Sequence, residues 1–345
     1  MSSRYDFNYA RDYYRACRDR EESLITPESG VLLIGGAEGG LSGEDAATQW
    51  FLSRAKYGNY LVLRVGGIGE QARWICRNYR DWINSAAELS IDSREAANDR
   101  EVIELIRQAD ALFIAGGDQN DYQEYWEGTK TEDEVNYAVN HRKVPIAGTS
   151  AGMAILGDYY YAPDNKGILS SEILDDPFHY NIETIHKSDF LKIPYLERVI
   201  TDTHLDRMNS RNPETRYGRL LGLLAKVINQ DRDKLNTRAI GLEEGAFVAI
   251  DENGIAQVFG NGTSMGQDAY FLQANGGIPE QMEPGWPLIW NNQGKAVKVY
   301  RISGTREGSG RFDLKDWSTA SGGQWEYWYT VGGKSGLRKE PISHN

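Results

Sequence analysis

The stretch Val144–Gly157, VPIAGTSAGMAILG, decides the fold of this chain. A short apolar run ends in Gly148–Gly152, GTSAG, and apolar residues then resume at helical spacing. A strand, a Gly-x-Ser-x-Gly turn and a helix in this order are typical of a nucleophile elbow, where the central residue is strained and needs small neighbours. Ser150 is therefore a candidate nucleophile, and the backbone N–H of Ala151 is a candidate oxyanion donor.

A second Gly-x-Ser-x-Gly match, Gly262–Gly266, lies in a segment rich in glycine and asparagine. This composition predicts a loop between strands, so we interpret Ser264 as a loop residue. A glycine-rich packing turn is the alternative interpretation of the first match. The strand and helix that flank Ser150 favour the nucleophile.

Composition limits the class of protein. The chain has 345 residues, 40% of them hydrophobic and 26% charged, which is typical of a globular protein with a large core. A formal net charge of −12 argues against nucleic acid or an anionic membrane as partner. Cys17 and Cys76 have no metal-binding or redox spacing, so no disulfide framework is expected, and the five histidines form no zinc motif. The N-terminus lacks the order of a signal peptide, which favours a cytoplasmic protein.

Short apolar runs alternate with helical segments in the first half of the chain. The runs are Val31–Ile34, Tyr60–Val65, Ala111–Ala115 and Val144–Ala147. This alternation predicts an α/β fold: a doubly wound, mostly parallel sheet with helices on both faces. Ligands bind at the carboxyl ends of such strands, and three of the runs end in glycine turns. We therefore expect Gly116, Gly117 and Ser150 to lie on one rim of the sheet.

The remaining segments predict a simple domain organisation. Residues 1–28 carry aromatic and charged residues at helical intervals and predict an N-terminal helical arm. Residues 29–345 are expected to form a single α/β catalytic domain. Its residues 270–345 are expected to be a β-rich extension whose strands close the edge of the same domain. Residues 239–242 and 246–250 are expected to pair as neighbouring strands.

A serine nucleophile needs a base and a group that orients the base. His204 ends a predicted strand, where side chains reach the rim, whereas His179 and His186 lie in a loop-like segment. For the orienting carboxylate, Glu172 and Asp202 are both plausible. Asp202 lies two residues before His204, so both side chains point to the same face of an extended strand.

Several motifs occur in one order along the chain. They are Ile34–Glu38, Ala115–Gln119, Gly148–Gly152, Ser170–Glu172, Asp202–His204 and Arg216–Leu220, followed by Gly241–Glu244 and Arg311–Leu314. In this order they resemble the cyanophycinase and peptidase E family of serine peptidases, whose fold is similar to that of class I glutamine amidotransferases. Several independent motifs are more specific than the serine turn alone.

The resemblance implies a triad and an oxyanion hole. Ser150 would attack the scissile carbonyl, His204 would act as general base and then acid, and Glu172 would orient His204. The N–H groups of Gly117 and Ala151 would form the oxyanion hole. The substrate-binding residues implied by the resemblance are Gln119, Asp202, Arg216 and Arg219.

The implied activity is an exopeptidase that cleaves the β-linked Asp-Arg polymer cyanophycin to β-Asp-Arg dipeptides through an acyl-enzyme. The alternatives are an Asp-X dipeptidase like peptidase E, another isopeptide hydrolase, or a non-catalytic binding protein with this fold. The resemblance implies a peptide substrate, no metal or organic cofactor, and a homodimer.

The chain departs from the family pattern in three places. Gly39–Gly40 follow the first turn, Thr203 stands between Asp202 and His204, and the segment between His204 and Arg216 is longer than usual. Either Arg207 or Arg211 is expected to supply the arginine that this longer segment displaces. These departures concern the substrate more than the fold.

Overall fold

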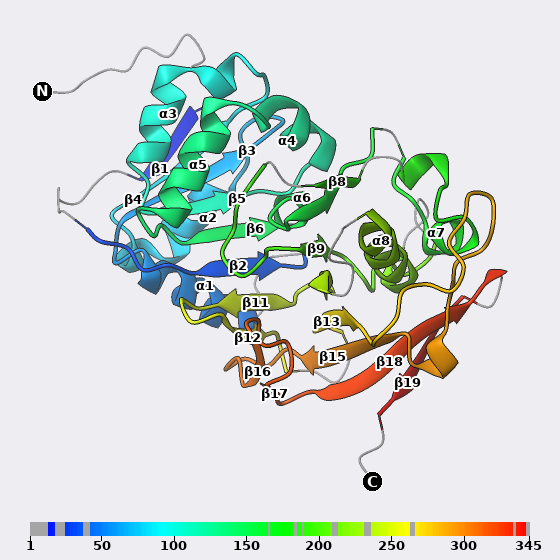
Figure 1. Ribbon diagram of the computed structural model, residues 1–345. Helices are drawn as coiled ribbons and strands as arrows, with labels where there is room; N and C mark the ends of the chain where they lie inside the picture. Colours follow the sequence, from blue (N-terminus) through cyan, green and yellow to red (C-terminus); the bar gives the residue numbers. More distant parts are fainter. Residues whose placement is uncertain are drawn as a thin grey trace, which may run out of the picture.

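The computed structural model describes residues 13–17, 25–36, 42–164, 166–182, 185–187, 190–208, 213–230, 236–262, 266–333 and 336–342. In these residues the chain forms two sheets with helices packed against them (Figure 1). Gly39–Gly40, Arg211, Ser264 and part of the first motif lie outside the described residues.

The first sheet contains the parallel strands that the sequence predicts. Its order is β1 (Tyr13–Cys17), β4 (Ser85–Ser90), β3 (Asn59–Arg64), β5 (Ala111–Ile114), β6 (Ile146–Thr149), β2 (Val31–Ile34), β11 (Phe247–Ile250), β12 (Ile255–Phe259), β16 (Gly310–Asp313) and β17 (Ala320–Ser321). The strands from β4 to β2 run parallel to one another, and the flanking strands are antiparallel. The sheet is therefore mixed.

The second sheet is mainly antiparallel. Its order is β14 (Ile289–Trp290), β18 (Gln324–Val331), β15 (Val297–Ser303), β13 (Asp268–Ala274), β10 (Arg238–Leu242), β9 (Val199–Asp202), β7 (Tyr159–Tyr161) and β8 (Ile185–Lys187), with β19 (Leu337–Pro341) on β18. Within it, β9 pairs in parallel with both β7 and β10.

The helices are α1 (Ser42–Arg54), α2 (Gln71–Asn78), α3 (Arg100–Arg107), α4 (Gln119–Trp126), α5 (Lys130–Asn140), α6 (Ala151–Ala154), α7 (Ser170–Asp175) and α8 (Tyr217–Gln230). None of the helices in the described part of the chain is long and apolar enough to cross a membrane.

Alternation of buried side chains explains the layers. Leu32 of β2 faces one side of the first sheet and packs with α1 and α2, whereas Leu33 faces the other side and packs with α3 and α5. Phe271 of the second sheet shares the cluster of Leu33, so the two sheets pack on each other. α7 and α8 cover the opposite face of the second sheet (Figure 1).

The α/β class and the helices on both faces of the parallel strands are confirmed. Residues 270–345 are rich in strands as expected: β16 and β17 belong to the first sheet, and β15, β18 and β19 belong to the second, together with β13. The predicted pairing of residues 239–242 with 246–250 is wrong, since β10 and β11 lie in different sheets. Alternating apolar residues reveal a strand but not the sheet that it joins. The single-domain assignment of residues 29–345 stays a prediction.

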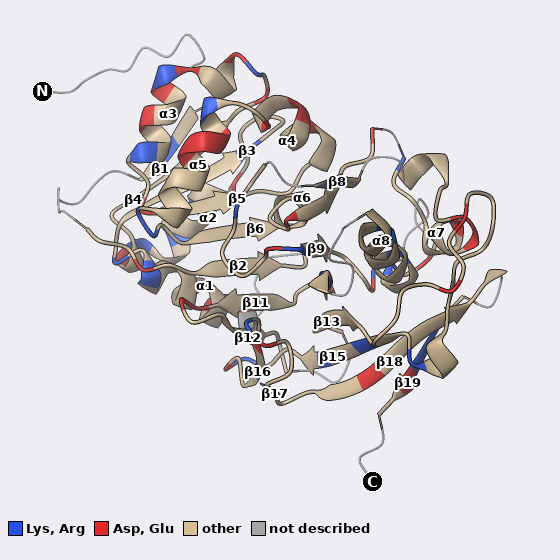
Figure 2. Cartoon of the chain, viewed as in Figure 1, with Lys and Arg blue, Asp and Glu red and all other residues tan. Residues whose placement is uncertain are grey.

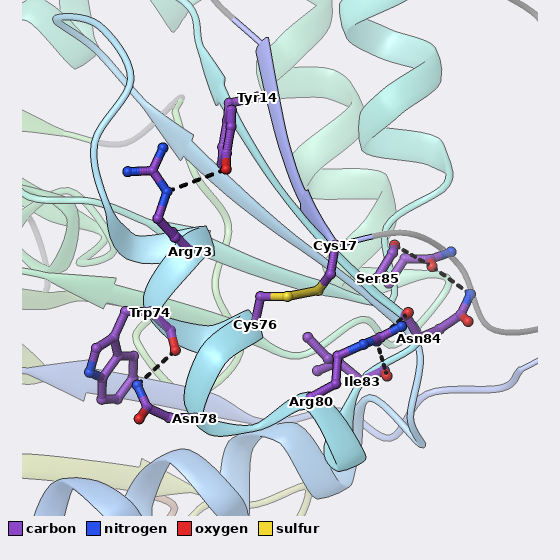
Figure 3. Close-up of a disulfide and its surroundings, with 11 residues drawn as sticks. Tyr14, Cys17, Arg73, Trp74, Cys76, Asn78, Arg80, Ile83, Asn84 and Ser85 are labelled. Carbon is purple, nitrogen blue, oxygen red and sulfur yellow. Dashed lines mark hydrogen bonds between the residues drawn. A yellow bond between two sulfur atoms is a disulfide. The ribbon is translucent and has the colours of Figure 1, made fainter.

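The N-terminal segment differs from the predicted helical arm. Tyr13–Cys17 forms the edge strand β1, which pairs antiparallel with β4. A disulfide joins Cys17 to Cys76 of α2, with their Cα atoms 6.0 Å apart, and Arg73 donates a hydrogen bond to Tyr14 at 3.3 Å (Figure 3). The expectation of no disulfide is therefore wrong. Sequence spacing says nothing about two cysteines that a sheet brings together.

The disulfide predicts a measurable loss of stability on reduction. It closes a loop between residues 59 positions apart, and such a crosslink contributes about 2–4 kcal/mol to the free energy of unfolding. We expect dithiothreitol to lower the melting temperature of the wild type to that of the Cys17→Ala/Cys76→Ala variant. Dithiothreitol should leave the variant unchanged. An unchanged wild-type melting temperature would show that this crosslink does not hold β1.

Candidate active site

Ser150 occupies a sharp turn between β6 and α6. Its backbone has φ 51° and ψ −119°, a conformation that L-residues rarely adopt. The glycines on either side are required by packing: a Cβ atom on Gly148 would lie 2.4 Å from the carbonyl oxygen of Gly152, and one on Gly152 would lie 2.2 Å from that of Ile114. The turn therefore holds the Ser150 hydroxyl beyond the carboxyl end of β6.

His204 lies beside Ser150, although it comes from the other sheet. It follows β9, has φ 55°, and is 8% exposed. Its Nε2 atom is 2.7 Å from Ser150 Oγ. The turn after β2 makes room for the ring, because a Cβ atom on Gly36 would lie 2.2 Å from the Cε1 atom of His204. The position of the imidazole thus depends on both sheets.

Glu244 contacts the second nitrogen of His204. Its Oε1 atom is 2.6 Å from His204 Nδ1. The backbone N–H of Glu244 donates to Asp206 Oδ1 at 2.9 Å, and Arg207 Nη1 lies 3.3 Å from Glu244 Oε1. Glu244 follows β10, at the point where the chain crosses from the second sheet to the first. Ser150, His204 and Glu244 therefore form a continuous hydrogen-bonded line.

The structure does not bring Glu172 to His204. Glu172 lies in the first turn of α7, where Oε2 accepts the backbone N–H of Leu169 at 2.8 Å and Oε1 lies 3.5 Å from Lys166 Nζ. A glutamate at this position satisfies a backbone donor that the helix leaves without a partner. The predicted role of Glu172 as orienting group is thus corrected: the carboxylate on His204 belongs to Glu244.

A signal for Glu244 was present in the sequence. The segment Gly241–Glu244 is one of the motifs, and a strand was predicted just before it. In the structure Gly241 pairs in parallel register with Asp202, so β9 and β10 end at the same edge. The missing information was that these two strands are neighbours, which only the fold supplies.

Burial lowers the pKa of His204 below that of an exposed histidine. Burial is the largest effect; the hydrogen bond to Glu244 raises the pKa, and the charges of Arg216 and Arg207 lower it. A lowered pKa keeps the imidazole neutral at neutral pH, so Nε2 can accept a proton from Ser150.

Of the two residues predicted to form an oxyanion hole, Ala151 directly follows Ser150, and Gly117 lies in a loop that approaches Ser150. Ala151 begins α6, where the first N–H groups of a helix have no acceptor within it. Gly117 lies in the loop between β5 and α4, and a Cβ atom on the preceding Gly116 would lie 3.4 Å from Ser150 Cβ. This loop therefore lies against the serine.

Two predicted substrate-binding residues bind each other. Arg219 Nε donates to Asp202 Oδ2 at 2.9 Å, and its Nη2 donates to Oδ1. Both side chains are buried. A bidentate pair of this kind positions both groups and neutralises their charges.

Two further arginines remain near the imidazole. Arg216 donates to the backbone carbonyl of Thr203 at 3.1 Å, and burial, reinforced by the charge of Arg219, lowers the pKa of Arg216 to about 10. Arg207 reaches Glu244, whereas Arg211 lies outside the described residues. Gln119 is the first residue of α4 and is partly exposed.

His179 makes a contact elsewhere in the structure. His179 accepts the backbone N–H of Asn181 through Nδ1 at 3.2 Å, which is a local turn contact. His186 lies in β8.

Comparison with known proteins agrees with the sequence motifs. The model of peptidase family S51 matches residues 69–175, a range that includes Ser150 but neither His204 nor Glu244. A cyanophycinase of Trichormus variabilis is 25% identical over 247 residues, which cover 70% of this chain and 74% of the relative. A cyanophycinase of Geminocystis herdmanii is 23% identical over 240 residues, covering 68% and 79%. The predicted resemblance to the cyanophycinase and peptidase E family is confirmed.

Among solved structures, a peptidase from an acI-B1 Actinobacterium is similar over 81% of this chain and 96% of its own, with a TM-score of 0.49 and 14% identity.

Assigning the orienting role to Glu244 instead of Glu172 predicts opposite outcomes for two matched variants, Glu244→Gln and Glu172→Gln. We expect Glu244→Gln to slow the reaction of Ser150 with a fluorophosphonate by about 10²–10⁴-fold, because His204 loses its charged partner. Glu172→Gln should react within about threefold of the wild type, since that side chain caps a helix. Intact-protein mass spectrometry over time measures both rates. A slow Glu172→Gln variant beside a fast Glu244→Gln variant would restore the original assignment.

The lowered pKa of His204 predicts the pH dependence of the same reaction. Only the neutral imidazole accepts the serine proton, so the rate should fall as pH drops through the pKa of His204. We expect the midpoint of this fall below 6.5, the ordinary pKa of histidine. Because Glu244 raises this pKa, Glu244→Gln should move the midpoint to still lower pH. A wild-type midpoint above 6.5 would contradict the account.

Proposed function

We propose that this chain, a relative of the S51 peptidases, is a serine exopeptidase that hydrolyses β-linked Asp-Arg polymer to β-Asp-Arg dipeptides. The observation that carries the proposal is the line of hydrogen bonds from Ser150 through His204 to Glu244. The S51 match and the cyanophycinases among its relatives support the class of substrate. A binding protein would not need this arrangement of nucleophile, base and orienting carboxylate.

The geometry supports a two-step mechanism. Ser150 Oγ attacks the scissile carbonyl while His204 Nε2 takes the serine proton, and Glu244 stabilises the imidazolium through Nδ1. The N–H groups of Gly117 and Ala151 stabilise the oxyanion. The proton on Nε2 then passes to the leaving amine, which leaves an ester between Ser150 and the acyl group. Water, activated by the same imidazole, hydrolyses the ester and restores Ser150.

Cations near the nucleophile support an acidic substrate. Arg207 forms an ion pair with Glu244, and the positive charge of Arg216 lowers the pKa of His204. Guanidinium groups bind carboxylates in a forked geometry, so these residues suit the free carboxylates of an aspartate-rich chain. We include Gln119, Asp202, Arg216 and Arg219 in the proposed substrate pocket, with Asp202 and Arg219 acting as a pair.

One observation favours an alternative substrate. Because Asp202 is already bound by Arg219, it offers no free carboxylate to an arginine side chain of a substrate. This arrangement suits an Asp-X dipeptidase or another isopeptide hydrolase whose substrate lacks arginine.

The disulfide is relevant to the cellular compartment in which the chain functions. Disulfides form and persist in oxidising compartments and are rare in the cytosol. In place of the cytoplasmic localisation expected from the sequence, we propose that the chain functions where Cys17–Cys76 stays oxidised. The homodimer and the exclusion of nucleic acid and membrane partners stay predictions.

The polymer assay tests the proposal. We expect wild-type protein incubated with insoluble Asp-Arg polymer to release β-Asp-Arg, detected by mass spectrometry of the soluble fraction, and Ser150→Ala to release none. The alternative predicts cleavage of Asp-X or isoaspartyl dipeptides by the wild type and no release from the polymer. Equal release by wild type and Ser150→Ala would overturn Ser150 as the nucleophile.

A further inference from the structure

Three aromatic rings form a cage on the face of the second sheet that α8 covers. Tyr217, Tyr270 and Trp328 contact one another with ring centroids 5.4–6.0 Å apart. Tyr270 is 3% exposed and Trp328 is 0% exposed, while Tyr217 is half-buried. We call these three residues the aromatic cage. None of them belongs to the catalytic line or to the substrate residues assigned above.

Buried carboxylates hold the polar atoms of the cage in place. Glu243 Oε1 accepts hydrogen bonds from the hydroxyl of Tyr270 at 2.8 Å and from that of Tyr217. Glu326 accepts the indole N–H of Trp328. Both glutamates are 4% exposed. The rings are therefore fixed, and acidic groups lie at their polar edges.

The ammonium of Lys339 lies against this cage, although Lys339 as a whole residue is exposed. Its Nζ atom lies 3.3 Å from the ring centroid of Tyr217, 4.4 Å from that of Trp328 and 5.2 Å from that of Tyr270. Lys339 stands opposite Trp328 on β19, a strand that is exposed along most of its length. Figure 2 shows basic segments on β15 and β19 beside an acidic segment on β18. An exposed outer strand thus inserts a cation among buried rings.

The carboxylates around the cage favour a cation within it. The charged groups that act on the Lys339 ammonium include Glu326, Glu243, Asp268 and Arg301. The three carboxylates favour the charged form of the ammonium, and the guanidinium of Arg301, which pairs with Asp268, opposes it. These charges favour a cation over a neutral group in the cage, and burial is the cost that a cation entering the cage must overcome.

Lys339 is a replaceable occupant. Burial of its ammonium among the rings lowers the pKa of Lys339 to about 8, so the cage holds the charged form less well than water does. A guanidinium is more weakly hydrated than an ammonium and stacks on aromatic faces. It therefore loses less hydration on entering the cage.

We propose that the aromatic cage binds the guanidinium group of an arginine-containing peptide, and that Lys339 occupies this site in the free protein. The site lies next to the catalytic residues in the chain: Glu243 precedes Glu244, and Tyr217 follows Arg216. The identity of the peptide, an arginine-bearing substrate, rests on the proposed function. Binding requires β19 to withdraw Lys339, which makes this strand a self-blocking element.

Binding is measured in Ser150→Ala protein, so that no turnover occurs. The test variant is Lys339→Thr, which empties the cage and keeps a strand-forming residue. Lys339→Arg keeps a cation in the cage. Lys298→Thr is the matched control, because Lys298 Nζ lies 3.9 Å from the Trp325 ring and so makes a similar contact outside the cage. The probe is N-acetyl-arginine amide, titrated by calorimetry, with N-acetyl-norleucine amide as the uncharged comparison.

We expect the Ser150→Ala/Lys339→Thr protein to bind one more equivalent of the arginine probe than the Ser150→Ala protein does. The added site should bind the arginine probe about tenfold more tightly than the norleucine probe. Lys339→Arg and Lys298→Thr should gain no site. The proposal is overturned if Lys339→Thr binds no additional equivalent of the arginine probe, or if it binds both probes with equal affinity. Lys339 would then serve only to hold β19 in place. If Lys339→Thr loses its thermal transition, Lys339→Gln takes its place with the same outcomes. Failure of polymer cleavage does not affect this measurement, since none of these variants turns over substrate.

Discussion

The hydrogen bonds of one imidazole join the two sheets of this protein at the proposed catalytic residues. Ser150 follows β6 of the first sheet, His204 follows β9 of the second, and Glu244 lies where the chain crosses between the two sheets. The imidazole fits there because Gly36 has no side chain. A shift of either sheet would break a hydrogen bond to His204, so the packing of the two sheets is a condition for the proposed chemistry.

Electrostatics set the state of this imidazole. Burial favours the neutral form, and Glu244 works against burial by favouring the cation. The balance leaves a neutral base that its carboxylate can still stabilise once it accepts a proton. Arg207 and Arg216 lie near the same groups, and their charges lower the pKa of His204 further. In the proposed function the same two arginines also present positive charge to the substrate.

Much of the fold could be predicted from local pattern. The glycines at residues 148 and 152 predict the turn at Ser150, and continuous apolar runs predict the parallel strands. The second sheet could not be predicted, because alternation in β13 and β15 does not identify their partners. Glu244 is missing from the predicted orienting groups for the same reason: Glu172 satisfies a helix end, whereas Glu244 reaches His204 only because β9 and β10 are neighbours. The disulfide likewise depends on β1 pairing with β4, which places Cys17 near α2.

The coupling between His204 and Glu244 is the central claim, and a double-mutant comparison tests it most directly. The rate of phosphonylation of Ser150 is measured in His204→Ala, in Glu244→Gln and in the variant that carries both changes. If Glu244 acts only through His204, the double variant reacts as slowly as His204→Ala and no more slowly. Losses that multiply in the double variant would show that the two residues act independently and would contradict the account.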